Sequence, residues 1–192
     1  MPKLVYLTGA PAAGKNSMTA LLAERVSDMV IWEYGSRLTE HVMARSAGVE
    51  NQDDLRTRSA GVVSPNDVAE VDQALLNFVE ANRTGRHVVI DSHAVTKEAY
   101  GYRITPFSLD QFGRLAPDEI WVLYTSPAET RRRISANSGG RPMVTEKEAE
   151  MHTALQASVA ATYGMSIGCP VYLFDTSVPR EQLVDLLAGR LA

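Results

Sequence analysis

Residues 4–17 read LVYLTGAPAAGKNS, an apolar run followed at once by a glycine-rich segment and a lysine. A strand that ends in such a segment, just before a helix, aims free backbone N–H groups at an anion. Gly9 and Gly14 permit backbone conformations that residues with a Cβ avoid. The ammonium of Lys15 can reach β- and γ-phosphate oxygens. We therefore interpret this segment as a phosphate-binding loop for ATP, formed by Gly9, Ala10, Pro11, Ala12, Ala13, Gly14, Lys15, Asn16 and Ser17.

The residue after the lysine departs from the strict form of this loop. That form has Ser or Thr directly after the lysine, whereas here Asn16 stands there and Ser17 follows. We expect the Ser17 hydroxyl to help place Mg²⁺. The alternative is a glycine-rich turn without a ligand, and the combination of Lys15, Ser17 and the preceding strand favours the phosphate loop.

The composition bounds the class of protein. The 192 residues are enough for one α/β domain, and a hydrophobic content of 45% is ordinary for a folded chain. A net charge of −4 gives no basic face for nucleic acid. The lone Cys169 excludes an internal disulfide and indicates a reducing compartment. No apolar stretch reaches the ~18 residues of a membrane span, and Met1–Leu7 belongs to the first strand rather than to a signal peptide. We expect a cytoplasmic protein without membrane or nucleic-acid partners.

Strand-like and helix-like segments alternate along the chain, without an internal repeat or a linker. This pattern predicts one α/β domain over residues 1–192, a five-stranded parallel sheet with helices on both faces. The expected strands are Lys3–Thr8, Met29–Trp32, His87–Asp91, Glu119–Thr125 and Pro170–Phe174. The expected helices are Lys15–Asp28, Ser36–Ala47, Asn51–Arg58, Pro65–Asn82, Leu109–Leu115, Pro127–Ala136, Glu146–Tyr163 and Pro179–Leu191.

Polar residues at the carboxyl ends of the strands are the candidates for chemistry, because ligands bind there in open parallel sheets. Asp91 ends a fully apolar strand, and we expect it to organise Mg²⁺ opposite the phosphate loop. A structural or capping role is the alternative for Asp91. His93 has two readings of equal weight: it binds the substrate, or it lines the loop.

Three consecutive arginines lie on one predicted helix, so they cannot all face one ligand. Arg141 follows Ser138-Gly139-Gly140, a flexible stretch that favours a small lid over about residues 136–145. We expect Arg132 and Arg141 to act on the transferring phosphoryl group together with Lys15 and Asp91. The alternative is a plain surface loop beside a basic helix.

The other candidates are weaker. The long segment after Asp91, which contains Lys97 and Tyr102, is expected to cover the site without individual roles for its residues. His41 and His152 lie on predicted helices and are interpreted as non-functional. The sequence has no Cys/His cluster that would indicate zinc.

These motifs resemble the archaeal-type adenylate kinases, a branch of the nucleoside monophosphate kinases. Besides the loop LTGAPAAGKNS, the resemblance covers YGS at 34–36, ENQDDLR at 50–56, VIDSH at 89–93 with GY at 101–102, PDEI at 117–120 and ATYG at 161–164. The DSH…GY segment discriminates better than the loop, which many kinases and ATPases share.

The resemblance implies a P-loop NTPase/kinase fold and the reversible transfer of the γ-phosphoryl group of Mg·ATP to AMP, which gives two ADP. It also implies a short lid, an acceptor-binding helical segment at about 34–84, small-molecule nucleotides as partners and a possible homo-oligomer. The acceptor-side residues would be Gly35, Ser36, Arg37, Ser92 and His93. From its place beside Gly35, Arg37 is a candidate to bind the acceptor's α-phosphate, and a solvated surface position is the alternative.

Three positions depart from that family's pattern. Ala12 replaces a common glycine, Lys15 stands where some members carry a small residue, and Asn16 replaces a usual threonine. Two other functions stay open at this point. One is a small-molecule kinase with a hydroxyl acceptor, for which Asp91 or His93 would be the general base. The other is an ATP-binding switch without acceptor turnover.

Overall fold

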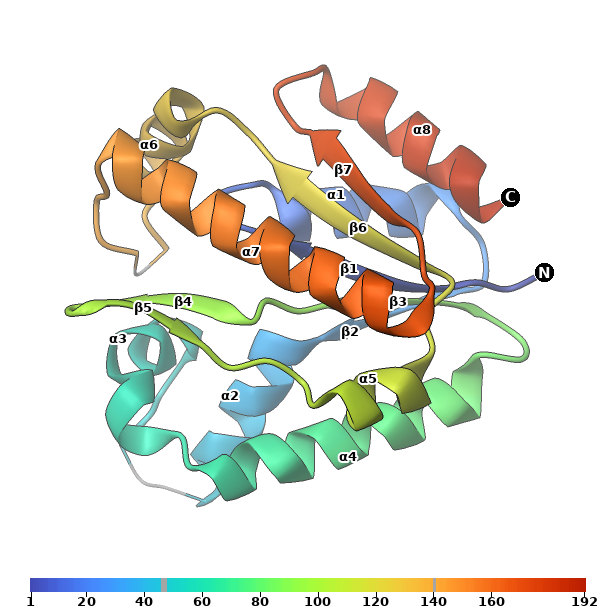
Figure 1. Cartoon of the computed structure of the whole chain (residues 1–192), viewed down its shortest axis with the longest axis horizontal. Coiled ribbons are helices and arrows are strands. Elements are labelled where there is room, and N and C mark those ends of the chain that lie inside the picture. Colours follow the sequence, from blue (N-terminus) through green and yellow to red (C-terminus); the bar gives the residue numbers. More distant parts are fainter. Residues whose placement is uncertain (46–47, 140) are drawn as a thin grey trace.

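A five-stranded, fully parallel sheet forms the centre of the molecule in the computed structural model, which describes residues 1–45, 48–139 and 141–192. Its strand order is β2-β3-β1-β6-β7 (Figure 1). The strands are β1 (Leu4–Gly9), β2 (Met29–Glu33), β3 (His87–Asp91), β6 (Glu119–Tyr124) and β7 (Val171–Asp175). The predicted α/β fold with a five-stranded parallel sheet is confirmed.

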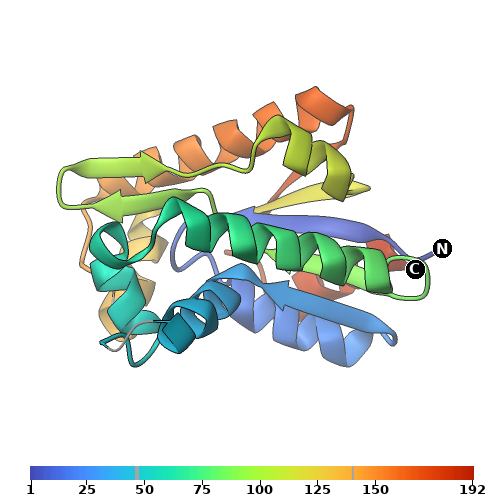
Figure 2. The same cartoon turned by 90° about the horizontal axis from the view of Figure 1, so that it is seen from below.

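Helices cover both faces of this sheet. One face carries α4 (Pro65–Asn82), α5 (Leu109–Leu115) and α7 (Glu146–Ile167), and the other carries α1 (Lys15–Arg25) and α8 (Arg180–Leu191) (Figures 1 and 2). Three further helices are α2 (Tyr34–Arg45), α3 (Gln52–Val62) and α6 (Pro127–Ala136). Helix α2 packs against α3 and α4, and α6 packs against α7.

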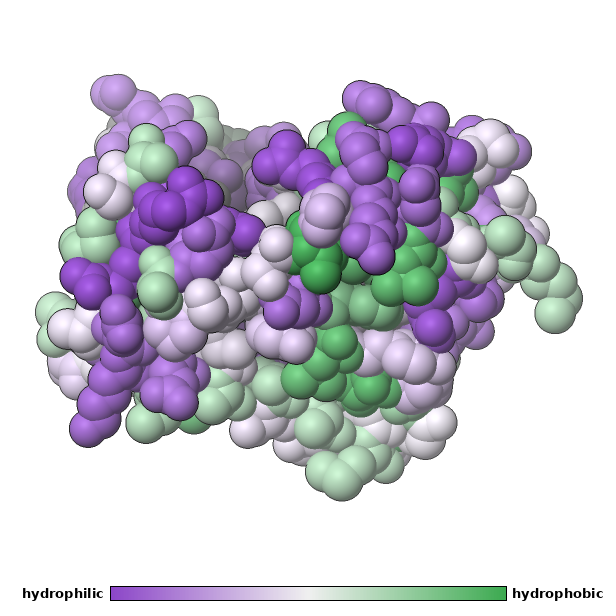
Figure 3. Space-filling model, turned by 90° about the horizontal axis from the view of Figure 1, so that it is seen from above, coloured by the Kyte–Doolittle hydropathy of each residue, from purple (hydrophilic) through white to green (hydrophobic). Residues whose placement is uncertain are grey.

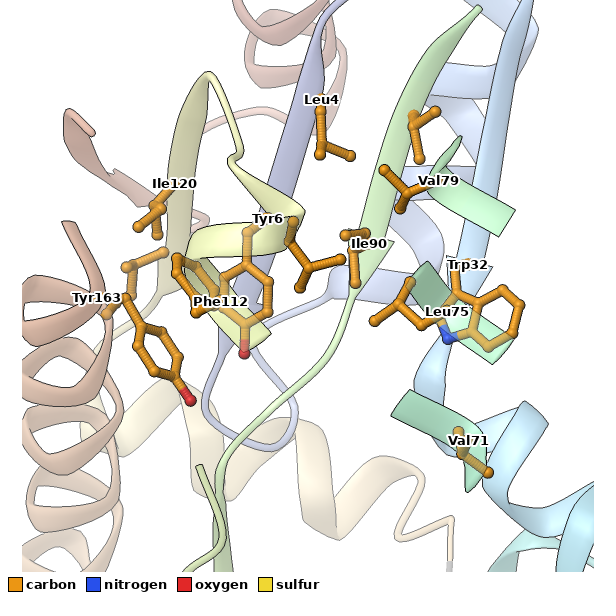
Figure 4. Close-up of a cluster of buried hydrophobic side chains, with 14 residues drawn as sticks. Leu4, Tyr6, Trp32, Val71, Leu75, Val79, Ile90, Phe112, Ile120 and Tyr163 are labelled. Atoms are coloured by element: carbon orange, nitrogen blue, oxygen red, sulfur yellow. The ribbon is translucent and has the colours of Figure 1, made fainter. Parts of the chain in front are cut away.

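The central strand β1 shows why the sheet is covered on both sides. All six of its residues are buried, as expected for a parallel strand between two helical layers. Leu4 and Tyr6 point to the cluster that α4, α5 and α7 complete, while Val5 and Leu7 point to the cluster of α1 and α8. Tyr6 meets Phe112 edge-on at 5.2 Å between ring centroids (Figure 4).

Several helix boundaries follow from local capping. Ser64, Ser108 and Thr145 each form a capping box, in which the side chain accepts from the third helical N–H and the third side chain accepts from the cap. Prolines occupy the first position of α4 and α6, where the missing N–H costs nothing. The predicted bounds of α4, α5 and α6 are confirmed. Helix α7 runs to Ile167 rather than Tyr163, and α3 runs to Val62 rather than Arg58.

A small antiparallel hairpin was not predicted. Strands β4 (Val95–Glu98) and β5 (Gly101–Ile104) form a separate two-stranded sheet within the segment that was expected only to cover the site. Val95 is tied to α7, because its N–H donates to Gln156 Oε1 at 3.1 Å and its carbonyl accepts from His152 Nε2 at 3.0 Å. Two predicted positions, Ala47 at the end of a helix and Gly140 in the lid, lie outside the described residues.

The molecular surface mixes polar and apolar regions. The face in Figure 3 is mostly hydrophilic on its left part, with hydrophobic residues gathered near the middle. Large exposed hydrophobic side chains include Leu173 of β7 and Leu186 of α8. Over the described parts of the chain, no helix is long and apolar enough to cross a membrane.

Candidate active site

A cavity of about 580 Å³ opens at the carboxyl ends of β1, β2 and β3. This volume falls in the range of roughly 300–1,000 Å³ that is typical of ligand sites. The phosphate loop forms one wall, helices α2 and α4 form another, and the β4–β5 hairpin and the start of α7 complete it. From the loop, the cavity is lined by Gly9, Ala10, Pro11, Lys15 and Asn16.

The loop needs its two glycines for different reasons. A Cβ on Gly9 would overlap the carbonyl oxygen of Leu123 on the neighbouring strand β6. Gly14, the N-cap of α1, has φ 89° in the left-handed region that favours glycine. Ala12 also lies in that region, at φ 61°. For a residue with a Cβ this conformation costs about 1–2 kcal/mol, so the alanine noted in the sequence carries local strain.

Lys15 and Asp91 come together as predicted. The Lys15 Nζ lies 3.8 Å from Asp91 Oδ1 and 3.4 Å from the carbonyl oxygen of Gly9. Burial raises the pKa of Asp91 above its ordinary value; the Lys15 ammonium acts in the opposite direction, and the Glu33 carboxylate adds to the rise. The structure therefore holds a positive charge at the loop, against a buried carboxylate, where phosphate oxygens would bind.

The oxygen ligands at this place suit Mg²⁺, which prefers carboxylates, hydroxyls, water and phosphate. Asp91 and Glu33 line the cavity and face each other in the register of β3 and β2. Ser17 is exposed on the first turn of α1 and is not among the lining residues. Within the described residues, no three His, Cys, Asp or Glu side chains are grouped to hold a metal by themselves. Mg²⁺ would therefore depend on Asp91, Glu33 and the phosphates, with Ser17 as the predicted hydroxyl.

The structure selects among the arginines differently from the prediction. Arg132 does not line the cavity: its side chain is 70% exposed and pairs with Glu129 at 2.6 Å. Arg133 instead reaches the phosphate loop, where Nη1 donates to the Ala12 carbonyl at 3.1 Å and Nη2 donates to the Thr176 carbonyl at 2.9 Å. Helical geometry predicted that the three consecutive arginines cannot all face the cavity, but it could not predict which of them contacts the loop. Arg141 lines the cavity, as expected.

On the acceptor side, the predicted residues divide in the same way. Gly35, Ser36, Ser92 and His93 line the cavity, and the Ser36 hydroxyl donates to Glu33 Oε2 at 2.9 Å. Arg37 points elsewhere. Its guanidinium lies over the Trp32 ring at 5.3 Å and pairs with Glu40 at 3.1 Å, because α2 already begins at Tyr34 and turns Arg37 away from the cavity.

Sequence reasoning missed His152 and Gln156 of α7. His152 is buried and lines the cavity. Since a carbonyl only accepts, His152 Nε2 carries the proton donated to Val95. Burial lowers the pKa of His152, the hydrogen bond to Val95 acts against this, and Lys15 and Lys97 add to the lowering. Gln156 also donates to the hydroxyl of Thr8, just before the loop. The sequence signal that could have indicated these two residues is their spacing of four positions on one predicted helix, which places them on the same face.

The parallel sheet, the loop at the end of its central strand and the lysine beside a buried aspartate define the class of P-loop nucleotide-binding proteins. The model of the family AAA_17, described as an AAA domain, matches residues 8–150, and the chain belongs to this family.

Curated relatives and solved structures are similar to this chain at low identity. An adenylate kinase of Thermococcus onnurineus is 27% identical over 168 residues, which are 86% of this chain and 82% of the relative. An adenylate kinase of Pyrococcus horikoshii is 25% identical over 171 residues, with the same shares of the two chains.

Two solved structures share the fold. A tunicamycin resistance protein of Deinococcus radiodurans has a TM-score of 0.57 at 12% identity, and a sugar kinase of Janibacter sp. HTCC2649 has 0.57 at 14%. Each comparison covers 100% of this chain and 96% of the other. At such identities the likeness concerns the fold.

Proposed function

We propose that this protein is a nucleoside monophosphate kinase, which transfers the γ-phosphoryl group of Mg·ATP to AMP or a related monophosphate. The observation that carries the proposal is one continuous cavity with two different walls. One wall is the phosphate loop with Lys15, and the other is formed by α2 and α4, so a donor and an acceptor have room side by side. The relatives named adenylate kinase make AMP the first acceptor to test.

The family and these relatives make the chain a P-loop phosphotransferase. In the proposed reaction, an acceptor phosphate oxygen forms a bond to the γ-phosphorus while the bond to the β–γ bridging oxygen breaks. The acceptor is already ionised, so no general base is required, and catalysis rests on positioning and charge neutralisation. Lys15 would neutralise the transferring group from the loop, and Arg141, which also lines the cavity, would do so as well.

Bound Mg²⁺ would neutralise charge on the phosphate oxygens. Asp91 and Glu33 would hold it from the strand ends, together with the predicted hydroxyl of Ser17. Asp91 would also keep Lys15 in place in the absence of nucleotide, because the two side chains form an ion pair at 3.8 Å. The same proposal includes a single domain over residues 1–192, with an acceptor-binding segment at about 34–84 and a short lid at about 136–145. It also includes a homo-oligomer.

A coupled assay of ADP formation tests the proposal. Mg·ATP is offered with AMP, GMP, CMP, UMP or dTMP in turn, beside a control without acceptor. Strong stimulation by a monophosphate is the expected result. ATP binding without stimulation by any of them would overturn the proposal.

A hydroxyl-acceptor kinase is the second candidate, favoured by one observation: the buried carboxylate of Asp91 lines the cavity, where it could accept a proton from a hydroxyl group. This function predicts turnover with a neutral acceptor and a rate that falls when the base is protonated. Stimulation by a nucleoside monophosphate in the assay above, without turnover of a neutral hydroxyl acceptor added to the same assay, would exclude it.

A further inference from the structure

The wall that α2 and α4 give to the cavity holds a carboxylate that phosphoryl transfer does not use. Asp72 of α4 lines the cavity and is only 4% exposed. The hydroxyl of Tyr34, at the start of α2, donates to Asp72 Oδ1 at 2.6 Å. Helices α2 and α4 pack against each other (Figure 2), so this contact is fixed by the fold.

Apolar side chains of α2, α3 and α4, namely Leu38, Leu55 and Val68, line the same cavity as Asp72. Burial raises the pKa of Asp72, and hydrogen bonds from Tyr34 and Gln111 act in the opposite direction. Among the residues that the structure describes, no lysine, arginine or histidine forms an ion pair with Asp72.

A carboxylate in this setting has unused capacity. Its two oxygens offer about four acceptor positions, and the hydroxyl of Tyr34 takes one of them. A buried carboxylate is costly unless donors surround it. A ligand that brings an N–H group to this wall would supply such a donor, whereas a ligand carbonyl there would set two acceptors against each other.

We propose that Asp72 is a specificity-determining residue that accepts a hydrogen bond from the exocyclic amine of the acceptor base. The site then favours amine-bearing bases, adenine and cytosine, over bases with a carbonyl at the same position, hypoxanthine and uracil. Tyr34 is its positioning residue, because its hydroxyl holds the Asp72 carboxylate by Oδ1 at the cavity wall. This inference rests on the proposed function and names its acceptor class.

The test compares AMP with IMP, which differ at this one group, in the wild-type protein and in Asp72→Asn. For the wild type we expect kcat/KM to favour AMP by at least about tenfold, since sites built around a hydrogen bond reject analogues that lack it. In Asp72→Asn the amide can donate to the carbonyl of IMP, so the AMP/IMP ratio is expected to fall towards one. Glu40→Gln is the matched control, because Glu40 is an exposed acid on α2 that pairs with Arg37, and its ratio is expected to stay at the wild-type value.

The outcomes separate the two proposals. Turnover of both nucleotides with the same ratio in the wild type and Asp72→Asn would overturn the role of Asp72 and leave the kinase proposal in place. Turnover of no monophosphate would overturn the kinase proposal and this inference with it. If Asp72→Asn does not fold, the wild type alone decides: equal kcat/KM for AMP and IMP, and for CMP and UMP, overturns the inference.

Discussion

At the scale of single residues, Lys15 is the side chain on which the proposed chemistry depends most. We predict that Lys15→Ala lowers phosphoryl transfer at least about 100-fold, since removal of one group that stabilises developing charge has costs of this order. The measurement is kcat in the coupled ADP assay, with circular dichroism to verify the fold. Lys147→Ala, which removes an exposed lysine of α7, is the matched control and should retain full activity. Wild-type-like turnover of Lys15→Ala would contradict the kinase proposal.

The neighbouring arginines of α6 form a natural pair of test and control. Arg133→Ala removes the hydrogen bonds to Ala12 and Thr176. Hydrogen bonds from charged groups contribute about 1.5–3 kcal/mol, so we expect the KM for ATP to rise roughly 10- to 100-fold. Arg132→Ala removes an exposed ion pair with Glu129, which is worth about 0–1 kcal/mol, and should change the KM little. Equal effects of the two substitutions would show that contact with the loop is unimportant.

His152 predicts a particular dependence of stability on pH. Its pKa is lowered in the folded protein by burial, so below the ordinary value of 6.5 the unfolded chain binds a proton that the folded chain does not. The free energy of unfolding should therefore fall as the pH drops below about 6.5, by at most about 1.4 kcal/mol per pH unit for one proton. His152→Gln, which keeps a donor for Val95, should lose this part of the dependence. Urea unfolding at pH 5 and pH 7 measures the free energy of unfolding of the wild type and of His152→Gln. The same change of this free energy between the two pH values in both proteins would contradict the prediction.

At the scale of elements, α7 connects the central sheet with the hairpin. Gln156 is 1% exposed and bonds both Thr8 and Val95. We predict that Gln156→Leu lowers the free energy of unfolding by about 1–3 kcal/mol, because the Val95 N–H and the Thr8 hydroxyl lose a buried partner. Urea denaturation measures this loss. Gln182→Leu, at an exposed site on α8, should stay within about 0.5 kcal/mol of the wild type.

The elements differ in how far local sequence determines them. Ser64 followed by Pro65 indicates the start of α4, and Ser126 followed by Pro127 indicates the start of α6, so the first residue of both helices was predictable. The β4–β5 hairpin was not. Its strands have four residues each and depend on bonds from α7, which lies some 60 residues away in sequence. Periodicity over so short a stretch cannot tell strand from loop.

At the scale of the whole molecule, strand order decides which residues meet. Alternation of strands and helices indicated a parallel sheet, but only long-range packing places β1 between β3 and β6. That order brings Asp91 beside Lys15, as the motif predicted. The contact between Tyr34 and Asp72 depends on the packing of α2 on α4, which no motif encodes. The sequence thus predicted that Asp91 and the loop meet on the donor side of the cavity, whereas it placed Arg132 there wrongly. The role of Ser17 stays a prediction, and the acceptor wall was predictable only in outline.

The hydrogen bond from Arg133 to the Ala12 carbonyl has a consequence for the affinity of the loop for a nucleotide. The loop is held in shape by the protein itself, through this guanidinium and the carbonyl of Thr176 on the far side. The loop therefore loses its conformational entropy when the protein folds, not when a nucleotide binds. Because the loop is preorganised, binding does not have to offset the cost of ordering it, and the affinity for the nucleotide is higher than it would be with a flexible loop.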